Sequence, residues 1–352
     1  MGSINEKLKK LYNEKIVGIE KKLEDVHYED HWLDGPQLMY CREENYNNSN
    51  LKILFVGQES NSWKGDIIEN TEDLMNQYKN FNFSNNSPFH NYIHWINGII
   101  NPNCNHNFLF TNVTKFCLFN EATGDGYPLD NITFEKTIEH FNVLKGEIEI
   151  TKPDIVIFFS GPNYDEKIKF QFDEELTFKP VFHDIAEKKL AKVSGSILPK
   201  HTYRTYHPKY LQINKQGCIL ERLITHILKE EKMLDLCNKN WLAINALFED
   251  LAQEKFYHNL KIQHKKYHDG DSYYEFWFEP YQHWAEIWMI DDYLEFWMAS
   301  KDEKEFIELA NQKFFFHGSS NNKFYYKNEK YQYSDIEALK KDLVPVLQEL
   351  SI

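Results

Sequence analysis

Residues 51–63, LKILFVGQESNSW, decide the fold of this chain, because an apolar run of strand length breaks at Gly57 into a polar turn. A continuous apolar run of this length is typical of a strand in a parallel sheet that is covered on both faces. In open α/β sheets, ligands bind at the loops that leave the carboxyl ends of such strands. We therefore expect the turn that begins at Gly57 to belong to a functional site.

Three later segments have a similar character. Residues 108–116 (FLFTNVTKF) form an apolar run that contains one amide, Asn112, and residues 153–162 (PDIVIFFSGP) form another that ends in small residues. Residues 203–211 (YRTYHPKYL) carry a His-Pro pair. Between and after these strands, helices are expected at residues 66–79, 88–100, 133–148 and 212–231. Strands that alternate with helices predict a parallel sheet with helices on both faces.

In this order and at these strand ends, the four segments resemble the motifs of the uracil-DNA glycosylase superfamily. That family's first motif reads GQDPYH after a buried strand, its second strand ends near an Asn, its third runs into a small-residue loop, and its last motif begins His-Pro. Residues 57–59 (GQE) stand at the positions of G, Q and D, whereas residues 60–62 (SNS) depart from P, Y and H. The resemblance covers roughly residues 50–230. It implies an α/β fold with a central four-stranded parallel sheet and helices on both faces.

The length of 352 residues and a hydrophobic fraction of 42% allow two domains, each with a core of its own. We expect a glycosylase-like domain at residues 1–234, in which residues 1–50 form an N-terminal helix and loop. Residues 236–352 contain 13 lysines, no arginine and 20 acidic residues, a formal charge of −7, and are rich in aromatic residues. The alternation of aromatic and polar residues over 273–300 predicts antiparallel strands, so residues 235–352 are expected to form an α+β domain of unknown role.

Compartment and cofactors follow from simple counts. The chain has no apolar stretch of membrane-spanning length and no apolar signal-peptide core near its N-terminus, which predicts a cytoplasmic protein without membrane contact. Its five cysteines include no CxxC pair, so neither a disulfide framework nor a zinc site is indicated. The cysteine spacing also gives no grounds for the iron–sulfur cluster that some members of the superfamily carry. We expect no cofactor and no metal.

The formal charge of −14 opposes a simple DNA-coating role, because lysine and arginine contacts to phosphates supply most non-specific affinity. A local basic rim can still hold DNA, since short-range fields decide docking at physiological salt. The expected rim consists of Lys200, His201, Arg204, Lys209 and Lys215.

The resemblance implies two catalytic residues. Cleavage of an N-glycosidic bond needs a carboxylate that steers water and stabilises the sugar cation, and a donor aimed at the departing base. Glu59 stands at the place of the first and His207 at the place of the second. The plainer alternatives are a solvated carboxylate near a helix N-terminus for Glu59, and a turn residue held by Pro208 for His207.

Asn112 and Gln58 are the expected base-reading amides. A carboxamide can pair with the edge of uracil or, rotated by half a turn, with that of cytosine, although Asn112 can also simply cap the following turn. At Asn61 the uracil-specific members carry a Tyr that packs against C5 of the base. The smaller Asn61 indicates a pocket open to a 5-substituted pyrimidine.

The other expected DNA contacts are of three kinds. Aromatic side chains can stack on the flipped base, small residues let the backbone approach a phosphate, and basic and apolar side chains hold or wedge the duplex. Core packing is the plainer alternative for the aromatic residue of the helix at 88–100. The residues are, in that order, Trp63 and Phe89, then Ser160 and Gly161, then Arg204, Lys209, Tyr210 and Leu211.

Together these expectations describe a monofunctional DNA glycosylase that removes a flipped pyrimidine from double- or single-stranded DNA. The favoured substrate is a 5-substituted cytosine or uracil, such as the modified bases of phage DNA, which would imply antiviral defence. A uracil-DNA glycosylase of base-excision repair is the alternative enzyme. A catalytically inactive DNA-binding module, whose acidic C-terminal domain recruits a protein partner, is the alternative from another class. A hydrolase of small nucleotides or esters is the least favoured, because P-loop, GxSxG and metal-ligand spacings are absent from the sequence.

Overall fold

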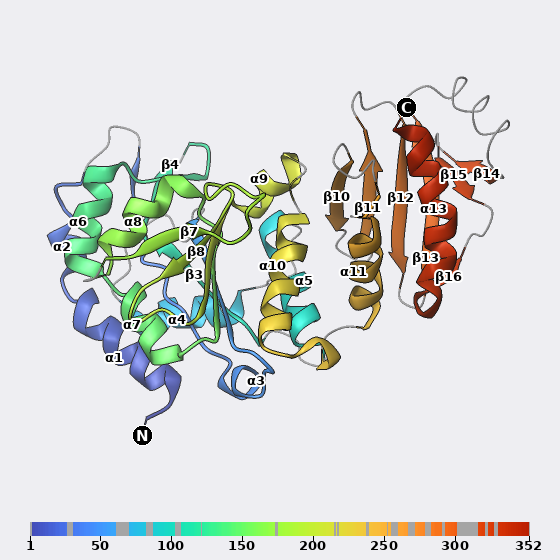
Figure 1. Cartoon of the computed structure of the whole chain (residues 1–352). Helices are drawn as coiled ribbons and strands as arrows, with labels where there is room; N and C mark the ends of the chain where they lie inside the picture. Colours follow the sequence, from blue (N-terminus) through green and yellow to red (C-terminus); the bar gives the residue numbers. More distant parts are fainter. Residues whose placement is uncertain are drawn as a thin grey trace. The chain divides into compact units, whose positions relative to one another are not determined.

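The computed structural model divides into two units, Met1–Phe83 with Asn103–His207 and Ser84–Pro102 with Pro208–Ile352. The division falls after His207 rather than after residue 234 as expected, and it assigns residues 84–102 to the second unit. The described residues are 2–26, 31–60, 70–81, 87–102, 107–120, 122–172, 175–214, 216, 218–236, 239–251, 253–254, 260–266, 272–278, 283–290, 293–300, 316–320, 323–326 and 330–351. Figure 1 shows their helices and strands.

A six-stranded mixed sheet forms the centre of the first unit, in the order β3-β2-β6-β9-β8-β7 (Figure 1). The neighbours from β3 to β9 pair in parallel, and the last two strands are antiparallel. The strands are β2 (Ile53–Glu59), β3 (Leu109–Thr114), β6 (Ile155–Phe158), β7 (Thr177–Pro180), β8 (Leu190–Ser194) and β9 (His201–Thr205). The α/β class is as expected, but the expectation of a wholly parallel four-stranded sheet is corrected to a mixed one. The two added strands are short and lysine-bearing, and no apolar run marks them in the sequence.

Helices of the first unit pack on one another beside this sheet. Helix α1 begins with a capping box in which Ser3 and Glu6 bond each other's backbone, and it contacts α4, α6 and α7. The helices are α1 (Ile4–Ile16), α2 (Ile19–Lys22), α3 (Glu43–Asn47), α4 (Thr71–Asn80), α6 (Asn131–Phe141), α7 (Leu144–Thr151) and α8 (Asp165–Phe170). A small antiparallel sheet joins β1 (Trp32–Asp34), β4 (Cys117–Asn120) and β5 (Asp125–Tyr127).

The second unit is α+β, as expected. Its antiparallel sheet has the order β10-β11-β12-β13-β15-β14, with β16 beside β13. One face of this sheet packs against α11 and α13 through buried residues such as Phe276, Ile287 and Leu343 (Figure 1). The elements are α5 (Pro88–Ile100), α9 (Pro208–Ile213), α10 (Cys218–Glu230), α11 (Lys239–Leu251), α13 (Ile336–Leu350), β10 (Lys261–Lys266), β11 (Ser272–Trp277), β12 (His283–Ile290), β13 (Tyr293–Ser300), β14 (Phe316–Ser320), β15 (Lys323–Tyr326) and β16 (Tyr331–Gln332).

Aromatic residues and carboxylates alternate along the opposite face of that sheet. The indole nitrogens of Trp284 and Trp288 both donate to the buried Glu286 carboxylate, at 2.7 and 2.8 Å respectively. The Tyr273 ring stacks on Trp288 with 4.3 Å between ring centroids. These contacts account for the alternating pattern seen in the sequence. Among the described residues, no helix is both long and apolar enough to cross a membrane.

Candidate functional site

The predicted motifs meet at the carboxyl ends of the parallel strands. The Gln58 side-chain amide donates to the Ser160 carbonyl at 2.8 Å, which joins the end of β2 to the turn after β6. The Gly161 N–H donates to the Thr205 carbonyl at 2.9 Å, which joins the same turn to the end of β9. Gly161 has φ of 74°, which strains residues with a side chain, and a Cβ atom there would lie 3.1 Å from the Tyr206 ring, so this position favours glycine.

Asn112 of β3 approaches the backbone of β2 at Gly57. The two residues are register partners, and a Cβ atom on Gly57 would overlap the end of the Asn112 side-chain amide, which explains why this position is glycine. The Asn112 amide also pairs with the amide of Gln37. In the orientation that suits its other neighbours, its oxygen accepts from the Ser60 N–H at 3.2 Å.

This arrangement differs from the expected role of Asn112. Its side chain is only 2% exposed, and both ends of the carboxamide meet protein groups. Asn112 therefore supports the turn after β2 and does not present a free edge to a base in this structure. Gln37, which is equally buried, is a residue that the sequence reasoning missed.

Glu59 is the carboxylate at the end of β2, and it is partly exposed. The Tyr164 hydroxyl, from the 3₁₀ turn Pro162–Tyr164 after β6, donates to Glu59 Oε2. Burial raises the pKa of the Glu59 carboxyl above its ordinary value, and the Tyr164 hydrogen bond and the Lys167 charge act against this rise. Burial, followed by the Glu59 charge, raises the pKa of the Tyr164 hydroxyl, so the phenol remains a donor at neutral pH.

Lys167 of α8 supplies a positive charge near this carboxylate. Its ammonium donates to the Leu129 carbonyl at 2.8 Å and lies 5.1 Å from the ring centroids of both Phe134 and Tyr164. Burial lowers the pKa of Lys167, and the nearby carboxylates Glu59 and Asp130 oppose that shift. No local pattern indicates Tyr164 or Lys167, because they reach Glu59 only through the turn and helix that follow a neighbouring strand.

His207 follows β9 by two residues and is partly exposed. Strand β6 separates β9 from β2, and neighbouring strands are spaced by about 4.8 Å, so the strand ends that carry Glu59 and His207 are about 10 Å apart. The two residues thus emerge at the same edge of the sheet.

Arg204 is a correction to the sequence-based expectation. Its side chain is 0% exposed, and it holds Asp165 through Nε at 2.8 Å and a terminal nitrogen at 2.9 Å. Its other terminal nitrogen donates to the carbonyls of Glu187 and Lys188. A guanidinium engaged in this way cannot contact a DNA phosphate. His201 of the expected rim is likewise buried.

Helix α9 of the second unit carries the remaining predicted DNA contacts. Lys209 and Tyr210 are exposed, Tyr210 by 42%, and their contacts with DNA stay a prediction. Leu211 is fully buried, so the expectation that it wedges into the duplex is wrong. Phe89 is buried in α5 with its ring edge against His90, which fits core packing better than base stacking. Asn61, Trp63 and Lys215 lie outside the described residues.

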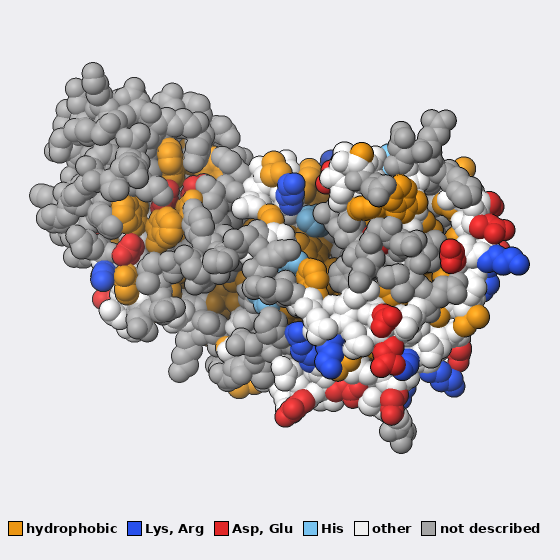
Figure 2. Space-filling view, turned by 180° about the vertical axis from the view of Figure 1, so that it is seen from behind, with side chains coloured by type: hydrophobic (Ala, Val, Ile, Leu, Met, Phe, Trp, Pro, Cys, Tyr) orange, Lys and Arg blue, Asp and Glu red, His pale blue; other side chains and the backbone are white. Residues whose placement is uncertain are grey.

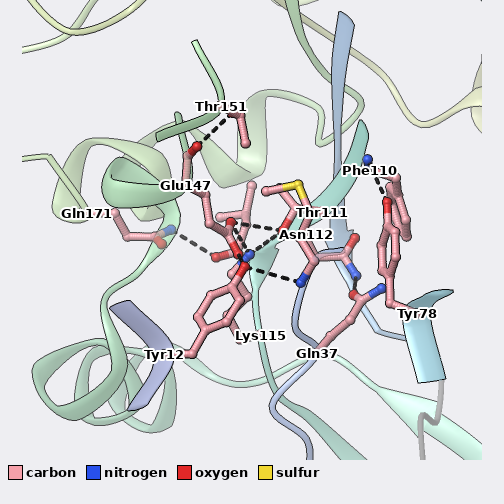
Figure 3. A network of polar contacts seen from close by, with 12 residues as sticks. Tyr12, Gln37, Tyr78, Phe110, Thr111, Asn112, Lys115, Glu147, Thr151 and Gln171 are labelled. Carbon is pink, nitrogen blue, oxygen red and sulfur yellow. Dashed lines mark hydrogen bonds and ion pairs between the residues drawn. The ribbon is translucent and has the colours of Figure 1, made fainter. Parts of the chain in front are cut away.

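A buried ion pair, which the sequence analysis did not predict, joins Lys115, the residue after β3, to Glu147 of α7 (Figure 3). Lys115 Nζ and Glu147 Oε2 are 2.6 Å apart, with the two side chains 1% and 0% exposed. Tyr12 and Thr111 donate to the two oxygens of Glu147 at 2.7 and 3.0 Å. The Lys115 carbonyl accepts from the N–H of Gln37 at 2.8 Å. The network therefore holds in place the segment that contains Gln37, whose side-chain amide pairs with that of Asn112.

No protein-family model, curated protein or solved structure was found to match this chain. The described residues also contain no group of three or more His, Cys, Asp or Glu side chains arranged to hold a metal ion. The geometry of the site and the motifs that resemble the glycosylase superfamily are therefore the basis for inferring function.

Proposed function

We propose that this chain is a DNA glycosylase that hydrolyses the N-glycosidic bond of a flipped pyrimidine and leaves an abasic site. The observation that carries the proposal is the placement of Glu59 and His207 at the carboxyl ends of β2 and β9, on either side of the Ser160–Gly161 turn. We also propose that the sheet of the first unit is of the uracil-DNA glycosylase type. Parallel strands in the order β3-β2-β6-β9 support it.

The chemistry follows from these positions. The bond between the sugar C1′ and the base nitrogen breaks, and its electron pair leaves with the base. Glu59 stabilises the positive charge that develops on the sugar and accepts a proton from the attacking water, which adds at C1′. Tyr164 occupies one oxygen of Glu59, which leaves the other for the water. His207 donates a hydrogen bond to the oxygen of the departing pyrimidine.

The preferred substrate is a 5-substituted cytosine or uracil. At position 61 this chain has Asn, where the uracil-specific members of the superfamily carry a Tyr that closes the pocket against C5. Such bases occur in phage DNA, and their removal would serve antiviral defence. Plain uracil, removed in base-excision repair, is the alternative substrate.

One observation favours a second candidate from another class. Asn112, the expected base reader, is buried against Gln37. A glycosylase-like unit whose reading amide is occupied can serve as an inactive DNA-binding module, with the acidic second unit recruiting a protein partner. The two candidates differ in whether any base is released.

The experiment is abasic-site formation on matched oligonucleotides that contain uracil, 5-methylcytosine, 5-hydroxymethylcytosine or a glucosylated cytosine. We expect release of at least one of these bases, and its loss in Glu59→Gln and His207→Ala. Both variants should remain folded. Burial of Glu59 penalises its charged form, so a neutral Gln is not expected to lower the free energy of unfolding at neutral pH.

Matched controls are available in the same unit. Glu166→Gln removes a carboxylate that is 85% exposed, and His183→Ala removes an imidazole that is 98% exposed, so both should retain full activity. Absence of release from every substrate by the unaltered protein would reject the enzyme and favour the binding module. Unchanged release in Glu59→Gln and His207→Ala would remove those residues from the catalytic site.

A further inference from the structure

Four lysines gather on the antiparallel edge of the first unit's sheet, in a protein whose formal charge is −14. Residues 177–205 contain five lysines and one arginine against two acidic residues, a formal charge of +4. Lys179 and Lys188 are exposed, and Lys189 and Lys192 are partly exposed. We call Lys179, Lys188, Lys189 and Lys192 the lysine surface.

The strand register sets two of these lysines against each other. Lys179 of β7 and Lys192 of β8 are direct cross-strand neighbours. Like charges directly opposite on antiparallel strands are destabilising, and an anion placed between them relieves the repulsion. Lys192 also pairs with Tyr203 of β9, and its ammonium lies 5.9 Å from that ring.

The buried Arg204 holds the turn that contains the other two lysines, Lys188 and Lys189, at the edge of the sheet that carries Glu59. Its guanidinium donates to the Glu187 and Lys188 carbonyls at 3.1 and 2.8 Å, and the neighbouring Thr205 hydroxyl donates to the Lys189 carbonyl at 2.9 Å. Thr205 also accepts the Gly161 N–H. The turn at 187–189 is therefore fixed beside the turn that borders the Glu59 site, with its backbone held and its side chains outward.

Some lysines elsewhere in the described residues, such as Lys9, Lys136 and Lys340, have carboxylate partners. On the face shown in Figure 2, acidic and basic side chains are interspersed. Within the described part of the chain, no carboxylate lies within ion-pair distance of any member of the lysine surface. Its charge is available to an outside anion.

We infer that the lysine surface binds the phosphate backbone of DNA and guides the duplex to the edge of the sheet that carries Glu59. Arg204 acts as a positioning residue that holds the 187–189 turn and does not itself touch DNA. The inference relies on DNA as the substrate in the proposed function, but not on which base is removed. A polyanion is repelled by the acidic remainder of the protein, which leaves this surface as the favoured docking place.

The test is binding of a labelled duplex of unmodified DNA, measured by fluorescence anisotropy over a range of salt concentrations. Lys188→Gln/Lys189→Gln and Lys179→Gln/Lys192→Gln should each reduce the salt slope by about 1.8, because each lost phosphate contact removes about 0.9 from it. Affinity at low salt should fall roughly tenfold for each lysine that contacts a phosphate. The substituted side chains are on the surface, so the variants are expected to fold.

The matched control is Lys7→Gln/Lys10→Gln, which removes the same charge from exposed positions of α1. Its salt slope should equal that of the unaltered protein. Equal slopes in all three variants would overturn the inference. So would binding of labelled poly-glutamate that depends on the same four lysines without any binding of DNA, because the surface would then suit an acidic protein.

Unmodified DNA separates this inference from the proposed catalysis. A reduced slope in the lysine variants, with no base released from any substrate, would support the lysine surface and reject the enzyme. Base release with unchanged slopes would support the enzyme and reject the lysine surface.

Discussion

We predict that the hydrogen bond from Tyr164 to Glu59 affects the pH dependence of base release. Replacing Tyr164 by Phe removes the donor and retains the ring near Lys167. The hydrogen bond favours the ionised form of Glu59, so its loss raises the pKa of this carboxyl further above its ordinary value. The acidic limb of the rate profile, which reports ionisation of Glu59, should therefore move to higher pH.

The size of the effect follows from the kind of bond that is lost. A hydrogen bond to a charged group contributes about 1.5–3 kcal/mol. At pH values below the pKa of Glu59, this loss corresponds to a carboxylate fraction that is roughly 10- to 150-fold smaller. At alkaline pH the carboxyl is ionised in both proteins, so kcat/KM of Tyr164→Phe should approach that of the unaltered protein. Lys167→Met should shift the limb in the same direction, because the Lys167 charge also stabilises the carboxylate.

The assay is kcat/KM for base release at a series of pH values, on whichever substrate the unaltered protein accepts. Titration of Glu59 by NMR with labelled glutamate provides a second readout that needs no substrate. Tyr127→Phe is the matched control, because Tyr127 is an exposed tyrosine whose described contact is a ring contact with His31 that Phe preserves. A loss that is equal at every pH would show that Tyr164 acts only through packing. An unchanged profile and an unchanged Glu59 titration would refute the reasoning.

Two further predictions concern stability. Gly57→Ala places a methyl group against the Asn112 side-chain amide and should lower the free energy of unfolding by about 1–3 kcal/mol. Gly98→Ala, which adds a methyl group with no atom within 4 Å on an α-helix, should raise it by up to about 1 kcal/mol. Urea unfolding of the two variants measures both values, and equal stabilities would contradict the close packing at Gly57. Lys115→Met leaves the Glu147 charge buried without its partner and should lower the free energy of unfolding by about 3–5 kcal/mol. Lys115→Met combined with Glu147→Leu should recover much of this loss in the same assay, and a double variant less stable than the single one would argue against an electrostatic cause.

Local pattern was a good guide where short-range chemistry decides the conformation. The Ser-Pro signal at residues 87–88 predicted the helix start, and α5 spans Pro88–Ile100 with the Ser87 side chain accepting the His90 N–H. Apolar runs located β2 and β6. The predicted single helix at 133–148 is instead two, α6 and α7, separated at residues 142–143. Helical periodicity alone does not reveal such a break.

The lysine-bearing strands show a second limit of the sequence. Residues 177–180 (TFKP) and 190–194 (LAKVS) are short and mixed in polarity. They become strands because β9 offers a free edge that β8 can pair with, and β8 in turn pairs with β7. Pairing of this kind depends on a neighbour and not on the pattern within the strand.

The sequence by itself determined the buried strands, the order of the motifs along them and the aromatic α+β character of the second half, because each depends on residues close together in the chain. Only the tertiary structure decided how the polar residues are used. Arg204 looked like a surface cation, yet Asp165, 39 positions earlier, and two backbone carbonyls hold it inside the fold. Glu59 acquired Tyr164 as its partner from 105 positions away. A polar side chain is satisfied by whatever group the fold brings to it, and that group is set by packing across the sheet rather than by neighbours in the chain.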